Sequence, residues 1–258
     1  MTQRLAGKRL IVVGSATGIG AATVKRLIAE GAQVCAADIN ISGAEKVAEE
    51  AGPNAFAVAI DIADEASVQT AVAAAVARMG GLDGAHINAA DLRVIMSDTD
   101  LLDMGMDVFD RTIAVNLRGH VLCARAVMPH LLKNEASAIV FTSSGSAHGA
   151  EPARACYAMA KAGINALMRH IAARWGKEGL TANVLAPGFT ITGELKANLE
   201  QNGAEAQKWL DVYRAKTPHT RLGEAEDHAA VVAMLLSEDG RWINGSIIDV
   251  NGGSLMRA

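Results

Sequence analysis

The feature that most constrains the fold is a repeated alternation between short apolar runs and longer helical segments. The apolar runs do not alternate between apolar and polar residues, as a strand with one exposed face would. Strands that are apolar throughout are buried on both faces, which is typical of a parallel sheet covered by helices on each side. We expect strands at 8–14, 32–38, 55–61, 82–90, 136–144, 180–188 and 245–253.

The segments between these runs predict helices, at 18–31, about 42–51, 65–79, 107–132, 155–175 and 224–236. Asp64 is placed to cap the third of them, because its side chain can accept a hydrogen bond from the first free amides. Residues 190–216 are more polar and irregular. The sequence therefore predicts one doubly wound α/β domain over 1–258, a parallel seven-stranded Rossmann-like sheet with a candidate substrate lid at about 190–216.

Composition excludes several classes of protein. Half of the 258 residues are hydrophobic, which excludes a disordered chain, and the net charge of −4 without a basic cluster argues against nucleic-acid binding. No apolar stretch is long enough to span a membrane, and the N-terminus does not read as a signal peptide. Three separated cysteines predict free thiols and a cytoplasmic location, and seven scattered histidines predict no metal site.

A glycine-rich loop joins the first strand to the first helix. In "VVGSATGIGAA" the glycines are Gly14, Gly18 and Gly20. Glycine at a tight turn lets the backbone approach a diphosphate, and the following helix terminus offers unpaired N–H groups. The loop predicts a dinucleotide-binding site rather than a purely structural turn.

Acidic residues end the second and third strands. Asp38 can accept hydrogen bonds from both ribose hydroxyls of adenosine and would repel a 2′-phosphate; no Arg or Lys follows in "DINISG". This favours NAD over NADP, with a helix cap as the structural alternative. Asp61 is equally consistent with a contact to adenine and with a simple cap.

Tyr157 and Lys161 are four residues apart and so share one helix face. An ammonium close to the phenol would lower the Tyr157 pKa from its usual value near 10 and make it a usable acid or base. A Tyr–Lys pair taken alone is more often a surface pair. Ser144, at the end of the fifth strand, is placed to hold a substrate oxygen.

Taken in order, these motifs resemble the short-chain dehydrogenase/reductase family over essentially the whole chain. The family's T-G-x-x-x-G-I-G pattern is matched by "VGSATGIG", and its helix-four asparagine by Asn116 in "AVNLRG". Its serine falls on Ser144, thirteen residues before Tyr157 of the Tyr-x-x-x-Lys motif. "PGFTIT" and "IIDVNGG" match the motifs around the last two strands.

The resemblance implies a catalytic tetrad and a cofactor site for NAD. The implied catalytic residues are Asn116, Ser144, Tyr157 and Lys161. The implied cofactor-binding residues are Gly14, Ser15, Thr17, Gly18, Ile19, Gly20, Asp38, Ile39, Asp61, Ile62, Asn88, Ala89, Ala90, Tyr157, Lys161, Pro187, Gly188, Thr190 and Thr192. Asn116 would kink its helix to hold a water linked to Lys161, Lys161 would also bind the nicotinamide ribose, and Thr192 the carboxamide.

Two residues depart from the family pattern. Val13 stands where a threonine hydroxyl usually braces the glycine loop, and Ala90 stands where glycine usually lets the backbone pass the cofactor. Alanine is accommodated if its φ is negative.

The implied activity is NAD-dependent interconversion of a secondary alcohol and a ketone. Leu195, Leu199, Trp209, Leu210 and Tyr213 in the lid, with Met96, Leu101 and Met104, favour a lipophilic, cyclic or steroid-like substrate; the lid residues can equally form a helix that packs on the body. The alternatives are an enoyl-thioester reductase of the same fold and a catalytically silent nucleotide-binding scaffold. The resemblance further implies a homotetramer built from helices 107–132 and 155–175 and the C-terminal segment.

Overall fold

A parallel sheet forms the centre of the computed structural model, which describes residues 3–193, 203, 207–208 and 210–256. Seven strands pair in the order β3-β2-β1-β4-β5-β6-β9, and each neighbouring pair is parallel. The predicted doubly wound sheet is therefore confirmed. The strands are β1 (Arg9–Val13), β2 (Gln33–Asp38), β3 (Ala55–Ala59), β4 (Gly84–Ile87), β5 (Ser137–Thr142), β6 (Leu180–Pro187) and β9 (Ile247–Val250).

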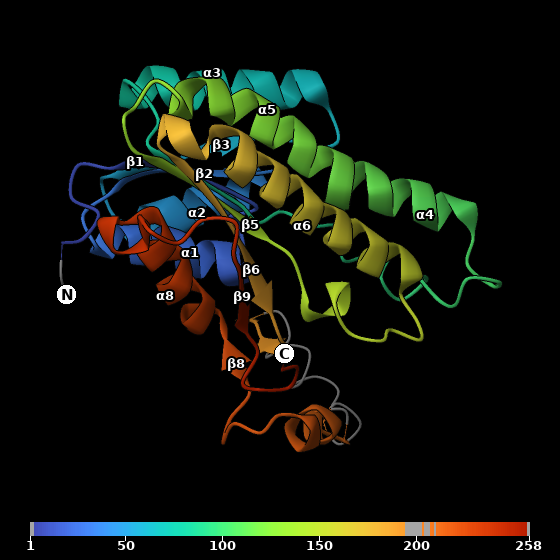
Figure 1. Cartoon of the computed structure of the whole chain (residues 1–258). Coiled ribbons are helices and arrows are strands. Elements are labelled where there is room, and N and C mark those ends of the chain that lie inside the picture. Colours follow the sequence, from blue (N-terminus) through green and yellow to red (C-terminus); the bar gives the residue numbers. More distant parts are fainter. Residues whose placement is uncertain (1–2, 194–202, 204–206, 209, 257–258) are drawn as a thin grey trace.

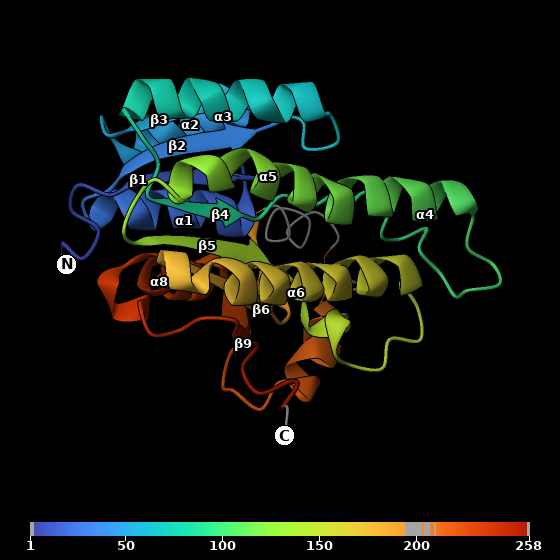
Figure 2. The same ribbon diagram turned by 45° about the horizontal axis from the view of Figure 1, so that its top comes forward.

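Helices cover both faces of the sheet, as Figures 1 and 2 show. One face carries α3 (Glu65–Met79), α5 (Gly119–Leu131) and α6 (Ala155–Trp175); the other carries α1 (Gly18–Ala29), α2 (Ile41–Ala51) and α8 (Ala225–Leu236). Asp64 caps α3 as predicted, since its carboxylate accepts a hydrogen bond from Ala66 N at 3.0 Å.

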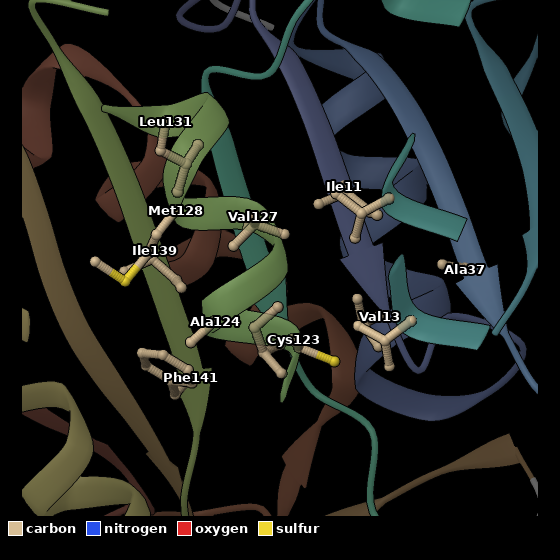
Figure 3. Close-up of a cluster of buried hydrophobic side chains, with 14 of the residues drawn as sticks. Ile11, Val13, Ala37, Cys123, Ala124, Val127, Met128, Leu131, Ile139 and Phe141 are labelled. Atoms are coloured by element: carbon tan, nitrogen blue, oxygen red, sulfur yellow. The ribbon is translucent and has the colours of Figure 1, made fainter. Parts of the chain in front are cut away.

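Two apolar clusters, one on each face, explain why the strands are apolar throughout. Figure 3 shows the first, in which Val127 and Met128 of α5 lie over Ile139 and Phe141 of β5. The second packs side chains from α1, α2 and α8 against the opposite face, including Leu10, Val24 and Val232. Burial on both faces makes a polar residue costly in these strands.

Three local features differ from the prediction. The expected helix 107–132 is broken into α4 (Met106–Ile113), a π-helical turn (Ala114–Arg118) and α5, since Gly119 N donates to Ala114 O. The strands are also shorter than the apolar runs, since the runs extend into the loops that follow. A two-stranded sheet of β7 (Thr190–Ile191) and β8 (Gly223–Glu224) is too short to give a sequence pattern.

Two of the five predicted lid residues are described by the structure. Leu210 is buried, and the Tyr213 ring stacks on Phe189 with 4.0 Å between ring centroids and 19° between planes. These contacts fit a segment that packs on the body of the protein. Leu195, Leu199 and Trp209 lie outside the described residues. Met96 and Leu101 are exposed.

Three histidines are buried in the protein interior. Nε2 of His86 lies 2.8 Å from Thr142 Oγ1, that of His120 lies 2.9 Å from Ala89 O, and that of His228 lies 2.7 Å from Thr190 Oγ1. Burial lowers the pKa of His86 and His120 to about 3 and that of His228 to about 4. The folded protein therefore holds all three rings neutral at physiological pH.

These histidines predict loss of stability in mild acid. In the unfolded chain each ring titrates near pH 6.5, so between about pH 6.5 and 4 the unfolded state binds more protons than the folded state. The stabilisation is fully present above pH 6.5 and is lost as the pH falls, with a slope approaching about 4 kcal/mol per pH unit where three rings contribute. Urea unfolding at a series of pH values measures this slope. In His86→Leu it should fall by about one third; an unchanged slope would contradict the assignment.

Candidate active site

The carboxyl ends of the parallel strands gather the predicted site residues at one edge of the sheet. β1 lies between β2 and β4, so the strand order reverses there, and this is the position where doubly wound proteins bind ligands. Gly14 follows β1, Asn88 follows β4, Ser144 follows β5 and Pro187 ends β6. The sheet thus brings together residues that are up to 173 positions apart, from Gly14 to Pro187.

The glycine loop has no space for side chains. A Cβ on Gly20 would lie 1.8 Å from Gly14 O, and a Cβ on Gly14, whose φ is +86°, would lie 2.5 Å from the Ala89 backbone. Thr17 precedes α1, and its side chain makes no capping hydrogen bond to the helix amides. The first turn of α1 therefore presents N–H groups beside a cradle of bare backbone, which fits a diphosphate.

Ser15 and Asp38 form hydrogen bonds that stabilise the glycine loop. The buried Ser15 hydroxyl donates to Ala37 O at 3.2 Å, so only the backbone of Ser15 is available to a cofactor. Asp38 accepts hydrogen bonds from Ala16 N at 2.9 Å and from Asn40 N at 2.8 Å. Each carboxylate oxygen has a further lone pair, so Asp38 can brace the loop and still accept a ribose hydroxyl.

The loop after β3 has a clear structural role. Asp61 accepts a hydrogen bond from Ala63 N at 2.9 Å, which stabilises the turn before α3, while Asp64 provides the helix cap. The Ile62 side chain is buried, and a Cβ on Gly119 would lie 2.8 Å from it. Any cofactor contact of Ile62 is therefore made by its backbone. The Ile39 side chain, by contrast, is exposed beside Asp38.

A chain of hydrogen bonds links the ends of β1, β4 and β5. Asn88 Nδ2 donates to Gly14 O at 2.9 Å, and Thr142 Oγ1 donates to Asn88 Oδ1 at 3.0 Å. Since the Thr142 proton is used there, His86 must donate its Nε2 proton to Thr142 Oγ1. The chain fixes the loop after β4 against the glycine loop. His86 and Thr142 were not predicted; polar residues in buried strands are the signal that marks them.

The two departures from the family pattern are accommodated by the backbone. Val13 is fully buried, and its carbonyl accepts hydrogen bonds from Asn88 N and Ala89 N, both at 2.9 Å. Among the described non-glycine residues only Arg154 has a positive φ. The φ of Ala90 is therefore negative, as its replacement of glycine requires.

The segment after β6 lies against the glycine loop. A Cβ on Gly18 would lie 3.3 Å from Thr192 Cγ2, so Thr192 reaches the predicted diphosphate site. The Thr190 hydroxyl is held between Gly188 O at 3.0 Å and His228 Nε2 at 2.7 Å. Gly188 N donates to Val250 O at 3.0 Å, which fixes the Pro187–Gly188 turn on β9.

Ser144, Tyr157 and Lys161 converge at the end of β5. The Tyr157 hydroxyl hydrogen-bonds to Ser144, and Lys161 Nζ lies 5.6 Å from the Tyr157 ring centroid. Nζ donates to Thr142 O at 2.9 Å and is buried. The predicted trio is therefore one cluster on α6 and the β5 loop.

The expected effect of Lys161 on the phenol is corrected by the structure. Burial raises the pKa of Tyr157, which outweighs the lowering by the hydrogen bond to Ser144 and by the charge of Arg154. Burial also lowers the pKa of Lys161 to about 7, and its ammonium is directed at Thr142 O. A lysine that is only partly protonated near neutral pH gives the phenol little positive charge. In the protein alone, the prediction of a lowered Tyr157 pKa is wrong.

Asn116 lies in the π-helical turn between α4 and α5, which is the predicted kink. Its buried amide accepts a hydrogen bond from Asp91 N at 2.7 Å and donates to Asp91 O at 3.3 Å. Both ends of the side chain are thus bound to the loop after β4. That this turn holds a water linked to Lys161 stays a prediction.

Asp98 anchors the amino end of α6. Its carboxylate accepts hydrogen bonds from Cys156 N at 3.1 Å and from Tyr157 N at 2.8 Å. It supplies the cap that Arg154, the residue preceding α6, does not provide. No sequence pattern marks this role, because Asp98 lies 59 residues before Tyr157.

Comparisons with known proteins agree with this geometry. The family model described as Enoyl-(Acyl carrier protein) reductase matches residues 14–254. The 2,5-dichloro-2,5-cyclohexadiene-1,4-diol dehydrogenase of Sphingobium indicum is 33% identical, over 96% of this chain and 97% of its own. Levodione reductase of Leifsonia aquatica is 31% identical, over 98% of this chain and 96% of its own.

Solved structures share the fold. A short-chain dehydrogenase from Burkholderia cenocepacia in complex with NADP has a TM-score of 0.85 and 34% identity, over 97% of this chain and 99% of that one. A 3-ketoacyl-(acyl-carrier-protein) reductase from Brucella melitensis with NADH has a TM-score of 0.86 and 29% identity, over 97% and 99%. The chain belongs to the short-chain dehydrogenase/reductase family. The relatives that it matches are named dehydrogenases and reductases.

Proposed function

We propose that this protein uses NAD(H) to interconvert a cyclic secondary alcohol and the corresponding ketone, with Tyr157 as the acid/base. The observation that carries the proposal is the convergence of Ser144, Tyr157 and Lys161 at the sheet edge that holds the glycine loop. Two relatives, the cyclohexadiene-diol dehydrogenase and levodione reductase, have names that support a cyclic substrate.

The chain's own residues position the reaction and move the proton. Bound nicotinamide supplies the hydride chemistry. The glycine loop and the amino end of α1 bind the diphosphate of the cofactor, and Asp38 binds its adenosine ribose. Lys161 binds the nicotinamide ribose, and Thr192 binds the carboxamide. Ser144 holds the substrate oxygen, and Tyr157 takes the hydroxyl proton in oxidation or returns it in reduction.

The choice of NAD over NADP rests on Asp38, whose negative charge repels a 2′-phosphate. We expect kcat/KM of the wild-type protein to be higher with NAD than with NADP by about 100-fold, which corresponds to about 2.7 kcal/mol. Asp38→Ser should reduce this preference at least tenfold, by about 1.4 kcal/mol or more. Initial rates with each cofactor and the same alcohol measure this preference. A wild-type preference for NADP would refute the role proposed for Asp38.

The enoyl-thioester reductase reading has the description of the matching family model in its favour. The Tyr157–Lys161 spacing argues against it, because that branch spaces its tyrosine and lysine more widely. Reduction of a crotonyl thioester, with no turnover of ketones, would decide for it. A silent nucleotide-binding scaffold would bind NADH and turn over neither.

We further propose a cytoplasmic homotetramer. Cys35, Cys123 and Cys156 are free and buried, as a reducing compartment allows. Ala162 and Ala166 are exposed on α6, beside the exposed Met159, and small residues there let a second copy pack closely. Light scattering should give four times the mass of one chain, and a monomer would refute the assembly. No helix in the described residues is long and apolar enough to cross a membrane.

A further inference from the structure

An ion pair lies beside the hydroxyls of the candidate active site. Glu151 Oε2 accepts hydrogen bonds from Ser146 Oγ at 3.0 Å and from Arg154 Nη2 at 2.9 Å. Ser146 N donates in turn to Ser144 Oγ at 3.2 Å. A single residue, Ser146, therefore separates the Glu151 carboxylate from the hydroxyl that bonds to Tyr157.

Arg154 adopts an unfavourable backbone conformation at this position. Its φ is +64°, and it alone among the described non-glycine residues has a positive φ. The conformation is fixed because Arg154 N donates to Asp98 O at 2.9 Å and to Thr99 O at 3.1 Å. Backbone strain of this kind clusters at functional sites. Arg154 lies three residues before Tyr157, and its guanidinium donates to Glu151.

Both charges act on the reacting phenol. The Arg154 guanidinium lowers the pKa of Tyr157, and the Glu151 carboxylate raises it. The hydrogen bonds of Ser146 to Glu151 and to Ser144 place the pair beside the predicted catalytic serine. Proton transfer through Tyr157 uses neither residue.

The pair keeps hydrogen-bonding capacity for a ligand. Glu151 uses Oε2 for both of its bonds and Arg154 uses Nη2, while Glu151 Oε1 and the other guanidinium N–H groups have no partner in the described part of the chain. A hydroxyl can donate to Oε1 and accept from Arg154 at once. Glu151 repels a carboxylate and Arg154 repels an ammonium, so a neutral hydroxyl is the complementary group.

We propose that Glu151 and Arg154 bind a second hydroxyl of the substrate, so that the site selects diols and hydroxyketones over simple alcohols. The inference rests on the proposed function and identifies the residues that set its substrate class. Leaving this ion pair without its hydroxyl partner is what disfavours a simple alcohol.

The test compares the cis and trans isomers of cyclohexane-1,2-diol with cyclohexanol, with NAD as oxidant. We expect kcat/KM for at least one diol isomer to exceed that for cyclohexanol by at least about tenfold, and Glu151→Leu to lower this ratio about tenfold. Arg154→Gly, which also removes the backbone strain, should lower it similarly. Glu151→Gln tests the charge with little change of shape. Glu178→Gln, which breaks a surface pair with Arg174, is the matched control.

Binding of the same alcohols to the NADH-loaded protein, followed by ligand-observed NMR, separates the inference from the proposed function. Tighter binding of a diol by the wild-type protein, weakened by Glu151→Leu, supports the inference even without turnover. Absence of turnover of every alcohol would instead overturn the proposed function. An unchanged ratio and unchanged diol binding in Glu151→Leu and Arg154→Gly would overturn the inference, as would equal losses for diol and cyclohexanol.

Discussion

Replacing Tyr157 by phenylalanine should lower kcat by about a thousandfold or more, because it removes the group that takes the substrate proton. The ring stays on α6 and only the hydroxyl is lost, so NADH affinity should change little. Single-turnover rates and a fluorescence titration with NADH measure the two effects separately.

The chain offers a matched control for this substitution. Tyr213, its only other tyrosine, stacks on Phe189. Tyr213→Phe keeps that stack and removes a hydroxyl that has no part in the proposed proton transfer, so turnover should stay within about threefold. Full activity of Tyr157→Phe, or an equal loss in both variants, would remove Tyr157 from the mechanism.

Gly20→Ala should abolish cofactor binding and destabilise the fold. The new Cβ would lie 1.8 Å from Gly14 O, and backbone in a tight turn cannot yield as a flexible side chain can. Displacing the loop moves Gly14 off Ala89 and breaks its bond to Asn88. We expect a loss of about 1–3 kcal/mol in the free energy of unfolding.

Thermal unfolding with and without NADH measures this effect. The wild-type Tm should rise with the cofactor, and the Gly20→Ala Tm should be lower and independent of it. Gly149→Ala is the control, since a Cβ at Gly149 would be 3.8 Å from its nearest neighbour, an ordinary contact. A cofactor-stabilised Gly20→Ala variant would show that the loop is not the diphosphate cradle.

The fold could be predicted from the sequence because burial on both faces leaves a direct mark. A run such as "LIVVG" is apolar at consecutive positions only if both faces of its strand are covered, and the structure has a core on each side. The π-helical turn at Asn116 has no such mark. It differs from the α-helix on either side by one added residue in a hydrogen-bonded ring, within the same apolar pattern.

The site residues that lie in short local motifs could be predicted from the sequence. The contacts that form only when distant segments pack together could not. Gly14, Gly20, Tyr157 and Lys161 lie in short patterns whose spacing carries their chemistry. The lowered pKa of Lys161 could not be predicted from the sequence, because the burial of this side chain depends on packing against residues distant in sequence. The Asp98 cap was missed for the same reason. The Glu151–Arg154 pair is local, but no sequence pattern marks the positive φ of Arg154.

The most direct test of the central claim is an initial-rate measurement of NAD reduction by cyclic secondary alcohols, followed through the absorbance of the reduced nicotinamide. We expect turnover by the wild-type protein, faster with NAD than with NADP and lost in Tyr157→Phe. Absence of turnover with both cofactors across the alcohols, in protein that binds NADH, would contradict it.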